Sequence, residues 1–227
     1  MVKAVIFDID GTLVDSVNLH AHAWQEAFQH FGHSIPFEDV RHQIGKGSDK
    51  LIPHFLSPLE DERLGEDLDA FRSELWKQKY LHQVQSFPQV RQLFERILAD
   101  GKHVVLASSA KGDELEEYKK IAGIADLVDR ETSSDDVENS KPDPDIIHAA
   151  LAKLHHVNPA EVIMVGDTPY DAIAAKKAGV RTIGVLCGGF PEPELLEAGV
   201  VAIYRDPSDL LIHYRKSPLG QAAEEAA

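Results

Sequence analysis

The chain has 227 residues, a formal net charge of −15 and a hydrophobic fraction of 43%. That fraction is sufficient for a folded core, and the length fits one large domain or a domain that carries an insertion. The negative charge argues against the basic patch with which proteins bind nucleic acid or an anionic membrane surface. No apolar run approaches the ~20 residues of a membrane-spanning helix, the first residues lack a signal-peptide layout, and the single Cys187 excludes an internal disulfide. We therefore expect a cytoplasmic protein with neither nucleic-acid nor membrane partners.

Residues 2–7 form a nearly continuous apolar run, and the carboxylates of Asp8 and Asp10 follow it, with Gly11 next. Such a run predicts a strand that is buried on both faces. Asp8 and Asp10 would leave its carboxyl end in similar directions, at the edge where open α/β sheets bind ligands. Two carboxylates this close repel each other, so the pair indicates a bound cation, a carboxyl group that stays protonated, or acid chemistry.

The chain after Ser16 is expected to be helical, without a strand, as far as about residue 84. Apolar residues recur there at helical spacing. The expected helices cover residues 19–31, 37–44, 49–56 and 59–80. Such a stretch, placed directly after the first strand, predicts a helical insertion.

Strands and helices alternate through the rest of the chain. The expected strands are residues 103–107, 127–129, 162–165, 182–186 and 200–204. The expected helices are residues 89–100, 113–122, 145–154, 170–178, 192–198 and 207–215, and residues 220–227 are expected to be a frayed end. This alternation predicts an α/β fold, a doubly wound, Rossmann-like parallel sheet.

Further polar groups follow the later strands. Ser108 and Ser109 come after residues 103–107, and Lys141 precedes a helix. Asp167 and Asp171 stand four residues apart after residues 162–165, a spacing that lets both face one ion. Taken alone, Lys141 also fits a surface lysine, and Asp167 also fits a helix N-cap.

Four motifs carry a resemblance to a known family. The first motif is Asp8-Ile9-Asp10-Gly11-Thr12-Leu13-Val14-Asp15-Ser16, and it is followed by Ser108, by Lys141 and by the run from Gly166 to Asp171. In order and spacing, these four motifs resemble those of the haloacid dehalogenase superfamily, specifically its helical-capped phosphatase and phosphomutase branch. The resemblance implies a catalytic core of residues 1–15 and 87–227, and a helical cap of residues 16–86 that selects the substrate. It also implies Mg²⁺ as the cofactor.

The resemblance implies a role for each catalytic residue. Asp8 would be the nucleophile that forms an aspartyl-phosphate, and Asp10 the general acid and base, protonated while Asp8 is ionised. Ser108, with Ser109 as its substitute, would bind phosphoryl oxygens, and Lys141 would balance charge. The metal ligands would come from Asp8, the backbone carbonyl of Asp10, and Asp167, while Asp171 would orient water or Lys141.

The remaining candidates concern substrate binding. Gly11 would form the turn after the first strand, and Thr12 would either cap the following segment or steady Asp10. His20 and Trp24, one helical turn apart, resemble a pair in the β-phosphoglucomutase group, although Trp24 also fits plain cap core. Lys46, in the loop Gly45-Lys46-Gly47-Ser48, would touch a distal polar group, and the alternative is an exposed turn between helices.

The predicted function is a Mg²⁺-dependent phosphatase for small phosphate monoesters of the sugar phosphate or phosphoglycolate type. The alternative is a β-phosphoglucomutase-like phosphomutase. The mutase is disfavoured because the loop around Lys46 lacks the arginine that clamps a second phosphate, and because Asp49 would repel that phosphate. A receiver domain fits poorly because it has no helical insertion after its first strand. A metal-free dehalogenase fits poorly because this chain has a second acidic residue, Asp10, after the first strand. The expected partner is a small phosphorylated metabolite, and the expected state is a monomer or a weak homodimer.

Overall fold

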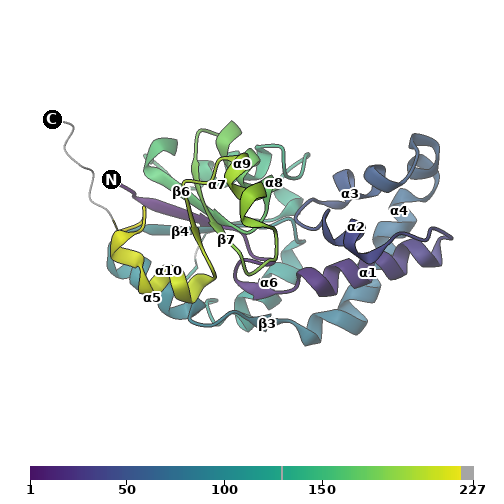
Figure 1. The fold of residues 1–227 in the computed structure, drawn as a ribbon, viewed down its shortest axis with the longest axis horizontal. Helices are drawn as coiled ribbons and strands as arrows, with labels where there is room; N and C mark the ends of the chain where they lie inside the picture. The colour runs from purple at the N-terminus through teal and green to yellow at the C-terminus, as the bar shows by residue number, and fades with distance from the viewer. Residues whose placement is uncertain (129, 221–227) are drawn as a thin grey trace.

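The computed structural model describes residues 1–128 and 130–220 and has a six-stranded sheet at its centre (Figure 1). The strands are β1 (Ala4–Phe7), β4 (His103–Ala107), β5 (Glu131–Thr132), β6 (Val162–Gly166), β7 (Arg181–Val185) and β8 (Ala202–Tyr204). Their order is β5-β4-β1-β6-β7-β8, and every neighbouring pair is parallel. The predicted fold class is therefore confirmed. After β1 the chain adds β4 and β5 on one side of β1, and it then adds β6, β7 and β8 on the other side. The direction in which strands are added therefore reverses between β1 and β6.

The central strands are buried because helices cover both faces of the sheet. Val5 and Phe7 pack in one apolar cluster with α5 (Val90–Ala99), α6 (Gly112–Ile121) and α10 (Pro207–Ile212). Ala4 and Ile6 point to the other face, against α7 (Asp145–Ala152) and α8 (Pro169–Lys177). Helix α9 (Glu192–Ala198) packs beside α8 in a smaller cluster around Leu195. The continuous apolar pattern of β1 thus reflects two covered faces.

The insertion after β1 is helical, as expected. It contains α1 (Val17–His30), α2 (Phe37–Arg41), α3 (Ser48–Phe55) and α4 (Pro58–Leu75). These helices share an apolar core of their own, which includes Trp24, Phe28, Leu51 and Leu68. In Figure 1 they extend beyond the end of the sheet at which β1 stops. The two chain segments that join them to the sheet pair as an antiparallel ribbon of β2 (Val14–Asp15) and β3 (Gln85–Ser86).

Several element boundaries differ from those expected. Leu127 lies in a turn in which its N–H bonds the carbonyl of Ile124, and the edge strand β5 pairs with β4 further along the chain. The strand expected at residues 127–129 is therefore wrong as far as residue 128; residue 129 lies outside the described residues. The helix expected at residues 59–80 is α4 followed by a π-helical turn, Trp76–Tyr80.

Other helices are shorter than expected. Helix α2 stops at Arg41, because the following residues turn toward a bridge between Ile44 and Lys46. Helix α10 ends at Ile212 and a 3₁₀ turn follows, Tyr214–Lys216. Further 3₁₀ turns are Leu81–Gln83, Ser134–Asp136 and Pro159–Glu161. The expected frayed end, residues 220–227, lies outside the described residues from 221 onward.

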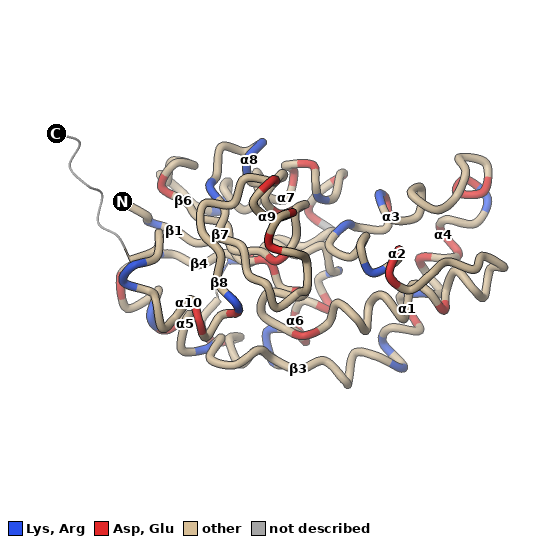
Figure 2. Tube along the Cα trace, in the orientation of Figure 1, with Lys and Arg blue, Asp and Glu red and all other residues tan. Residues whose placement is uncertain are grey.

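Charged residues are distributed over the sheet, its helices and the insertion. Figure 2 shows Lys and Arg interspersed with Asp and Glu along the trace. In residues 1–128 and 130–220, no helix has both the length and the apolar character needed to cross a membrane.

Candidate active site

Three carboxylates converge where β1 and β6 end. Asp8 follows β1, while Asp167 and Asp171 follow β6, and one oxygen atom from each lies within 4.8 Å of the others. All three are buried. Because β1 and β6 are adjacent and parallel, their carboxyl ends meet at one edge of the sheet, which is the edge where such sheets bind ligands.

Lys141 lies between two of these carboxylates. Its Nζ donates to Asp8 Oδ1 at 2.5 Å and to Asp171 Oδ1 at 2.8 Å, and the lysine is 1% exposed. The interpretation of Lys141 as a solvated surface lysine is therefore excluded. Since a buried ammonium is stable only when it is paired, the two carboxylates keep Lys141 charged and fix its position.

The cap at the start of α8 fixes the side chain of Asp171 but does not include Asp167. Thr168 caps the helix by accepting from the N–H of Asp171, and Asp171 Oδ2 in turn accepts from the N–H and Oγ1 of Thr168. This reciprocal arrangement is a capping box. Asp167 precedes the cap, so the expectation that it fits a helix N-cap is wrong. Its Oδ1 accepts from Thr12 Oγ1 at 3.0 Å.

The other oxygen of Asp167, Oδ2, is buried and has no hydrogen-bond partner in the part of the chain that the structure describes. Two glycines leave room around it. A Cβ atom on Gly11 would lie 2.3 Å from this oxygen, and one on Gly188 would lie 1.7 Å away. Gly11 also has φ +76°, a conformation that glycine adopts readily. The two glycines therefore let the backbone lie close to Asp167 Oδ2, and this buried oxygen remains unsatisfied among the described residues.

The electrostatics of the cluster favour a cation. Burial raises the pKa of Asp8 to about 7, although Lys141 opposes the shift. Burial, together with the charge of Asp8, raises the pKa of Asp167 well above its usual range. A divalent cation stabilises the ionised form of buried carboxylates, and carboxylate oxygens are the ligands that Mg²⁺ prefers. The orphaned Asp167 Oδ2 and the three buried carboxylates fit such an ion.

The side chain of Asp10 points away from this cluster, toward the helical insertion. Asp10 Oδ1 accepts from Ser16 Oγ at 2.5 Å and lies 3.0 Å from His20 Nε2. His20 Nε2 is also 3.0 Å from the hydroxyl of Tyr118, and its ring stacks on Trp76 with centroids 3.6 Å apart. His20 thus links Asp10 to α6 and to the insertion.

The pKa values of the two aspartates are opposite to the expectation. Burial alone would raise the pKa of Asp10, but the charge of His20 and the hydrogen bonds from His20 and Ser16 outweigh it and lower this pKa. Asp8 has a raised pKa instead. The direction of each shift is thus opposite to the one that a protonated Asp10 beside an ionised Asp8 would need, because Ser16 and His20 lie within hydrogen-bond distance of Asp10.

A cavity of ≈ 240 Å³ opens beside Asp8 and Asp10. Its walls include Asp8, Asp10, His20, Trp24 and Ser109. Ser109 lies 3.5 Å from the carbonyl of Gly45 across the cavity.

Ser108 does not line this cavity. It is fully buried, and its Oγ accepts from the N–H of Ala110 at 3.0 Å. The hydroxyl that faces the cavity after β4 therefore belongs to Ser109, because β4 ends at Ala107 and the bond between Ser108 and Ala110 turns the Ser108 side chain inward.

The remaining substrate-binding candidates lie around the opening. Trp24 is both part of the core of the insertion and part of the cavity wall. Lys46 lines the cavity too, but its Nζ donates to Gln43 Oε1 at 2.5 Å and lies 4.6 Å from the ring centroid of Tyr170. Burial lowers the pKa of Lys46. The loop is therefore more than an exposed turn, and Lys46 already has partners in it.

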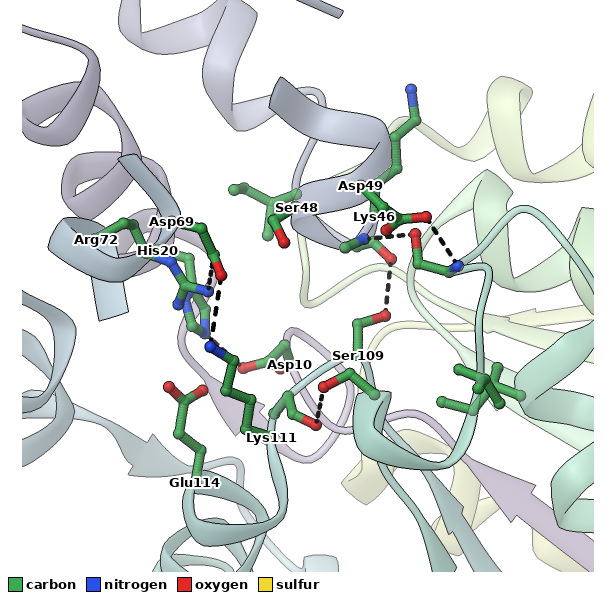
Figure 3. Close-up of a pocket in the computed structure, with 18 of the residues that line it drawn as sticks. Asp10, His20, Lys46, Ser48, Asp49, Asp69, Arg72, Ser109, Lys111 and Glu114 are labelled. Carbon is green, nitrogen blue, oxygen red and sulfur yellow. Dashed lines mark hydrogen bonds and ion pairs between the residues drawn. The ribbon is translucent and has the colours of Figure 1, made fainter. Parts of the chain in front are cut away.

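The sequence analysis did not identify the far wall of the cavity (Figure 3). This wall consists of Asp69 and Arg72 from α4, Lys111 before α6 and Glu114 in α6. In the sequence, the α4 residues stand among many charged residues of a surface-type helix, so periodicity alone gave no signal. The only available signal for Lys111 was its place two residues after Ser109.

Comparison with known proteins assigns the family. Residues 5–185 match the family model described as haloacid dehalogenase-like hydrolase. The chain is 33% identical over 194 residues to a phosphoglycolate phosphatase of Vibrio parahaemolyticus, covering 82% of this chain and 85% of that protein. It is 29% identical over 213 residues to a phosphorylated carbohydrates phosphatase of Thermotoga maritima, covering 92% and 96%. A solved hydrolase structure from Pseudomonas syringae superposes with a TM-score of 0.82 at 28% identity, covering 94% and 98%.

The fold, the four motifs and these matches agree. The chain belongs to the haloacid dehalogenase-like hydrolase family, and the predicted family is confirmed. The prediction that the protein is an enzyme of the hydrolase class is confirmed with it.

Proposed function

We propose that this protein is a Mg²⁺-dependent phosphatase that hydrolyses small phosphate monoesters through an aspartyl-phosphate on Asp8. The phosphatase activity follows from the family and from the relatives named above. The metal, the intermediate and the residue roles are our proposal. The observation that carries them is the buried cluster of Asp8, Asp167, Asp171 and Lys141 at the base of the cavity.

Asp8 is the proposed nucleophile. It is the one member of the carboxylate cluster that also lines the cavity. Lys141 binds Asp8 Oδ1, and Thr12 Oγ1 lies 3.4 Å from Oδ2, so these two donors fix the carboxylate plane. A carboxylate held in this way can attack a phosphorus atom, and the acyl phosphate that forms divides hydrolysis into two easier steps. Lys141 then offsets negative charge on the transferring group.

Asp10 is the proposed general acid and base. Its carboxylate lines the same cavity, two residues from Asp8. A lowered pKa disfavours a protonated carboxyl group, so this role requires a nearby proton source. His20 Nε2 lies 3.0 Å from Asp10 Oδ1, and we propose that it holds the proton which Asp10 passes to the leaving oxygen.

Asp8, Asp167 and the backbone carbonyl of Asp10 are the proposed Mg²⁺ ligands. Bound there, the ion would neutralise charge on the nucleophile and the phosphoryl oxygens. Asp171 is proposed to act indirectly, since its two oxygens are already engaged by Lys141 and Thr168. Ser109, which faces the cavity, is the proposed contact for a phosphoryl oxygen, and Ser108 shapes the loop that holds it.

The helical insertion is the proposed cap. We divide the chain into a catalytic core, residues 1–15 and 87–227, and a cap, residues 16–86. Support comes from the separate apolar core of the helices and from the two-stranded ribbon at which both connections meet. Residues from both parts line the cavity, so substrate choice depends on the cap and on its closure over the core.

A phosphomutase is the second candidate, and one observation favours it. Arg72 lines the cavity from the cap, so the cap does contribute an arginine, although not from the loop around Lys46. We prefer the phosphatase because Arg72 and Lys111 both contact Asp69, which offsets part of the charge needed to bind a second phosphate.

A screen of phosphorylated metabolites with phosphate release as the readout tests the proposal. We expect turnover of small phosphate monoesters with Mg²⁺ and loss of turnover with EDTA. Asp8→Asn should lower kcat by about 10⁴-fold or more, because the amide is not a nucleophile. Full activity in Asp8→Asn would exclude the covalent mechanism. Full activity in EDTA, after exhaustive dialysis, would exclude the metal.

A further inference from the structure

The steps proposed for phosphoryl transfer use no residue of the far wall of the cavity, yet this wall is built from charged side chains on or next to two separate helices. Asp69 and Arg72 reach it from α4 in the insertion, and Lys111 and Glu114 reach it from the start of α6 in the core (Figure 3). A substrate whose phosphoryl group is at Asp8 would place its leaving group toward this wall, because the cavity extends from Asp8 to these residues.

Arg72 is held in place while its buried Nε–H lacks a partner among the described residues. Its guanidinium carbon lies 4.8 Å from the ring centroid of Trp24, and Nη2 lies 3.5 Å from Asp69 Oδ1. The side chain is 12% exposed. Its Nε is buried and has no hydrogen-bond partner among the described residues. Stacking on Trp24 therefore fixes the guanidinium plane, while the buried Nε–H has no partner among the described residues.

Glu114 has a free acceptor in the same wall. It is 3% exposed, and its Oε1 is buried without a hydrogen-bond partner in residues 1–128 and 130–220. Figure 3 shows its carboxylate directed toward the Arg72 side of the cavity. Burial raises the pKa of Glu114, and the charge of Arg72 opposes that shift. A buried donor and a buried acceptor that both lack partners are costly, and a hydroxyl group satisfies both because it accepts and donates.

The charge of the wall argues for a neutral ligand. Lys111 Nζ lies 3.4 Å from Asp69 Oδ2, so Asp69 serves both Lys111 and Arg72. With Glu114 the wall has two cationic side chains and two carboxyl groups. A second anionic group on the substrate would meet Asp69 and Glu114, whereas hydroxyl groups can use every member of the wall.

We propose that Arg72 and Glu114 form a hydroxyl-binding subsite that selects phosphate monoesters of sugars or polyols over esters with a second anionic group. The inference rests on the proposed function, since the subsite acts on the alcohol part of an ester whose phosphoryl group is transferred to Asp8. Trp24 adds an apolar surface beside the subsite. Arg72 and Glu114 are thus specificity-determining residues on the cap and on the core, so the subsite is complete only when these two parts are together.

Steady-state kinetics with Mg²⁺ test the inference. The substrates are hexose and pentose phosphates, phosphoglycolate, and p-nitrophenyl phosphate, which has no aliphatic hydroxyl group. We expect kcat/KM for at least one sugar phosphate to exceed the values for the other two esters by about tenfold or more. Glu114→Gln should lower the ratio of kcat/KM between sugar phosphate and p-nitrophenyl phosphate by about tenfold, mainly through KM.

Arg72→Lys is the second variant, because lysine keeps the charge but lacks the Nε–H and the planar fork. We expect it to lower the same ratio. Glu117→Gln is the matched control: Glu117 is an exposed residue of α6 whose partner is Lys120, and the ratio should stay at the wild-type value. Thermal melts of all three variants verify folding.

The outcomes separate the two proposals. If the enzyme turns over these esters but prefers phosphoglycolate, or if Glu114→Gln and Arg72→Lys slow all esters equally, the subsite is overturned and the phosphatase remains. If no ester is turned over, including p-nitrophenyl phosphate, the proposed function falls and the subsite falls with it.

Discussion

The buried cluster at the base of the cavity contains more carboxyl groups than ammonium groups. Asp8, Asp167 and Asp171 face a single ammonium group, that of Lys141, so full ionisation would leave two uncompensated negative charges in a buried site. Without a cation, burial raises the pKa of Asp8 to about 7 and that of Asp167 well above its usual range. A divalent cation would neutralise the imbalance, and protons do so in its absence.

These shifts predict how metal and pH act on stability. The folded-state pKa of Asp8 is raised above its ordinary value of 3.8, so the metal-free folded protein binds more protons than the unfolded chain between about pH 4 and pH 7. The contribution of this carboxyl group therefore favours folding at low pH and is lost as pH rises through that window. Because Mg²⁺ replaces those protons, we expect it to raise Tm by ~5 °C more at about pH 8 than at about pH 5.

Differential scanning fluorimetry in Mg²⁺ and in EDTA measures this difference. Asp8→Asn is the control, since it removes both a proposed ligand and its titration, and its Mg²⁺ effect should be smaller and less dependent on pH. An equal Mg²⁺ shift at both pH values in the wild-type protein would contradict the assignment of Asp8 as a ligand.

At the scale of elements, the loop between α2 and α3 joins the insertion to the core. The N–H of Gly47 donates to Ser140 Oγ at 3.0 Å, and Asp49 Oδ2 accepts from the N–H of Ser140 at 3.1 Å. Nearby, the hydroxyl of Tyr170 donates to the carbonyl of His42 at 2.7 Å. These are a few partly exposed polar contacts, whereas the helices of the insertion have their own apolar core. Such contacts can break while both parts stay folded, so the loop can open without unfolding either part.

A reversible cross-link tests whether the loop must open. A Cβ on Gly47 would lie 2.7 Å from Ser140 Cβ, and a disulfide needs about 3.8 Å, so a shift of about 1 Å would let a bond form in Gly47→Cys/Ser140→Cys. We expect the oxidised double variant to lose about 100-fold in kcat/KM, because the substrate cannot enter, and to recover in dithiothreitol. The single variants under the same oxidant are the controls. Undiminished turnover in the fully cross-linked protein would show that opening at this loop is not required.

At the scale of the whole molecule, the core and the insertion together decide what accepts the phosphoryl group. A mutase has to exclude water from the aspartyl-phosphate and to hold a second phosphate with a cationic clamp. In this protein the cations of the cavity wall, Arg72 and Lys111, share Asp69 and stand beside Glu114. Lys46 is engaged with Gln43 and Tyr170. We therefore expect the proposed aspartyl-phosphate to react with water and to release free phosphate.

Incubation with β-glucose 1-phosphate and a trace of the 1,6-bisphosphate distinguishes the two reactions. We expect free phosphate to account for most of the product, at least about tenfold over glucose 6-phosphate, because water is the acceptor. Both products are quantified in the same sample, and phosphate release without the bisphosphate is the reference. Rapid formation of glucose 6-phosphate with little free phosphate would instead assign the protein as a phosphomutase.

The sequence by itself determined the fold class and the base of the site. The apolar runs that became β1 and β6 are local signals, and parallel strands bring their carboxyl ends to one edge, so Asp8 and Asp167 were predictable neighbours. The family resemblance identified Lys141, which taken alone also fits a surface lysine, and its ammonium group does lie between Asp8 and Asp171. Each of these predictions depends on residues close to a strand end or a helix start, where chain geometry leaves few alternatives.

Only the tertiary structure decided the direction of the Asp10 pKa shift and the composition of the far wall. Asp10 has a lowered pKa because His20 lies beside it, and His20 in turn contacts Tyr118, 98 residues further along the chain. Arg72 and Glu114 meet because α4 of the insertion faces α6 of the core. Burial and long-range packing set these properties, and neither is encoded in the local periodicity of the segments involved.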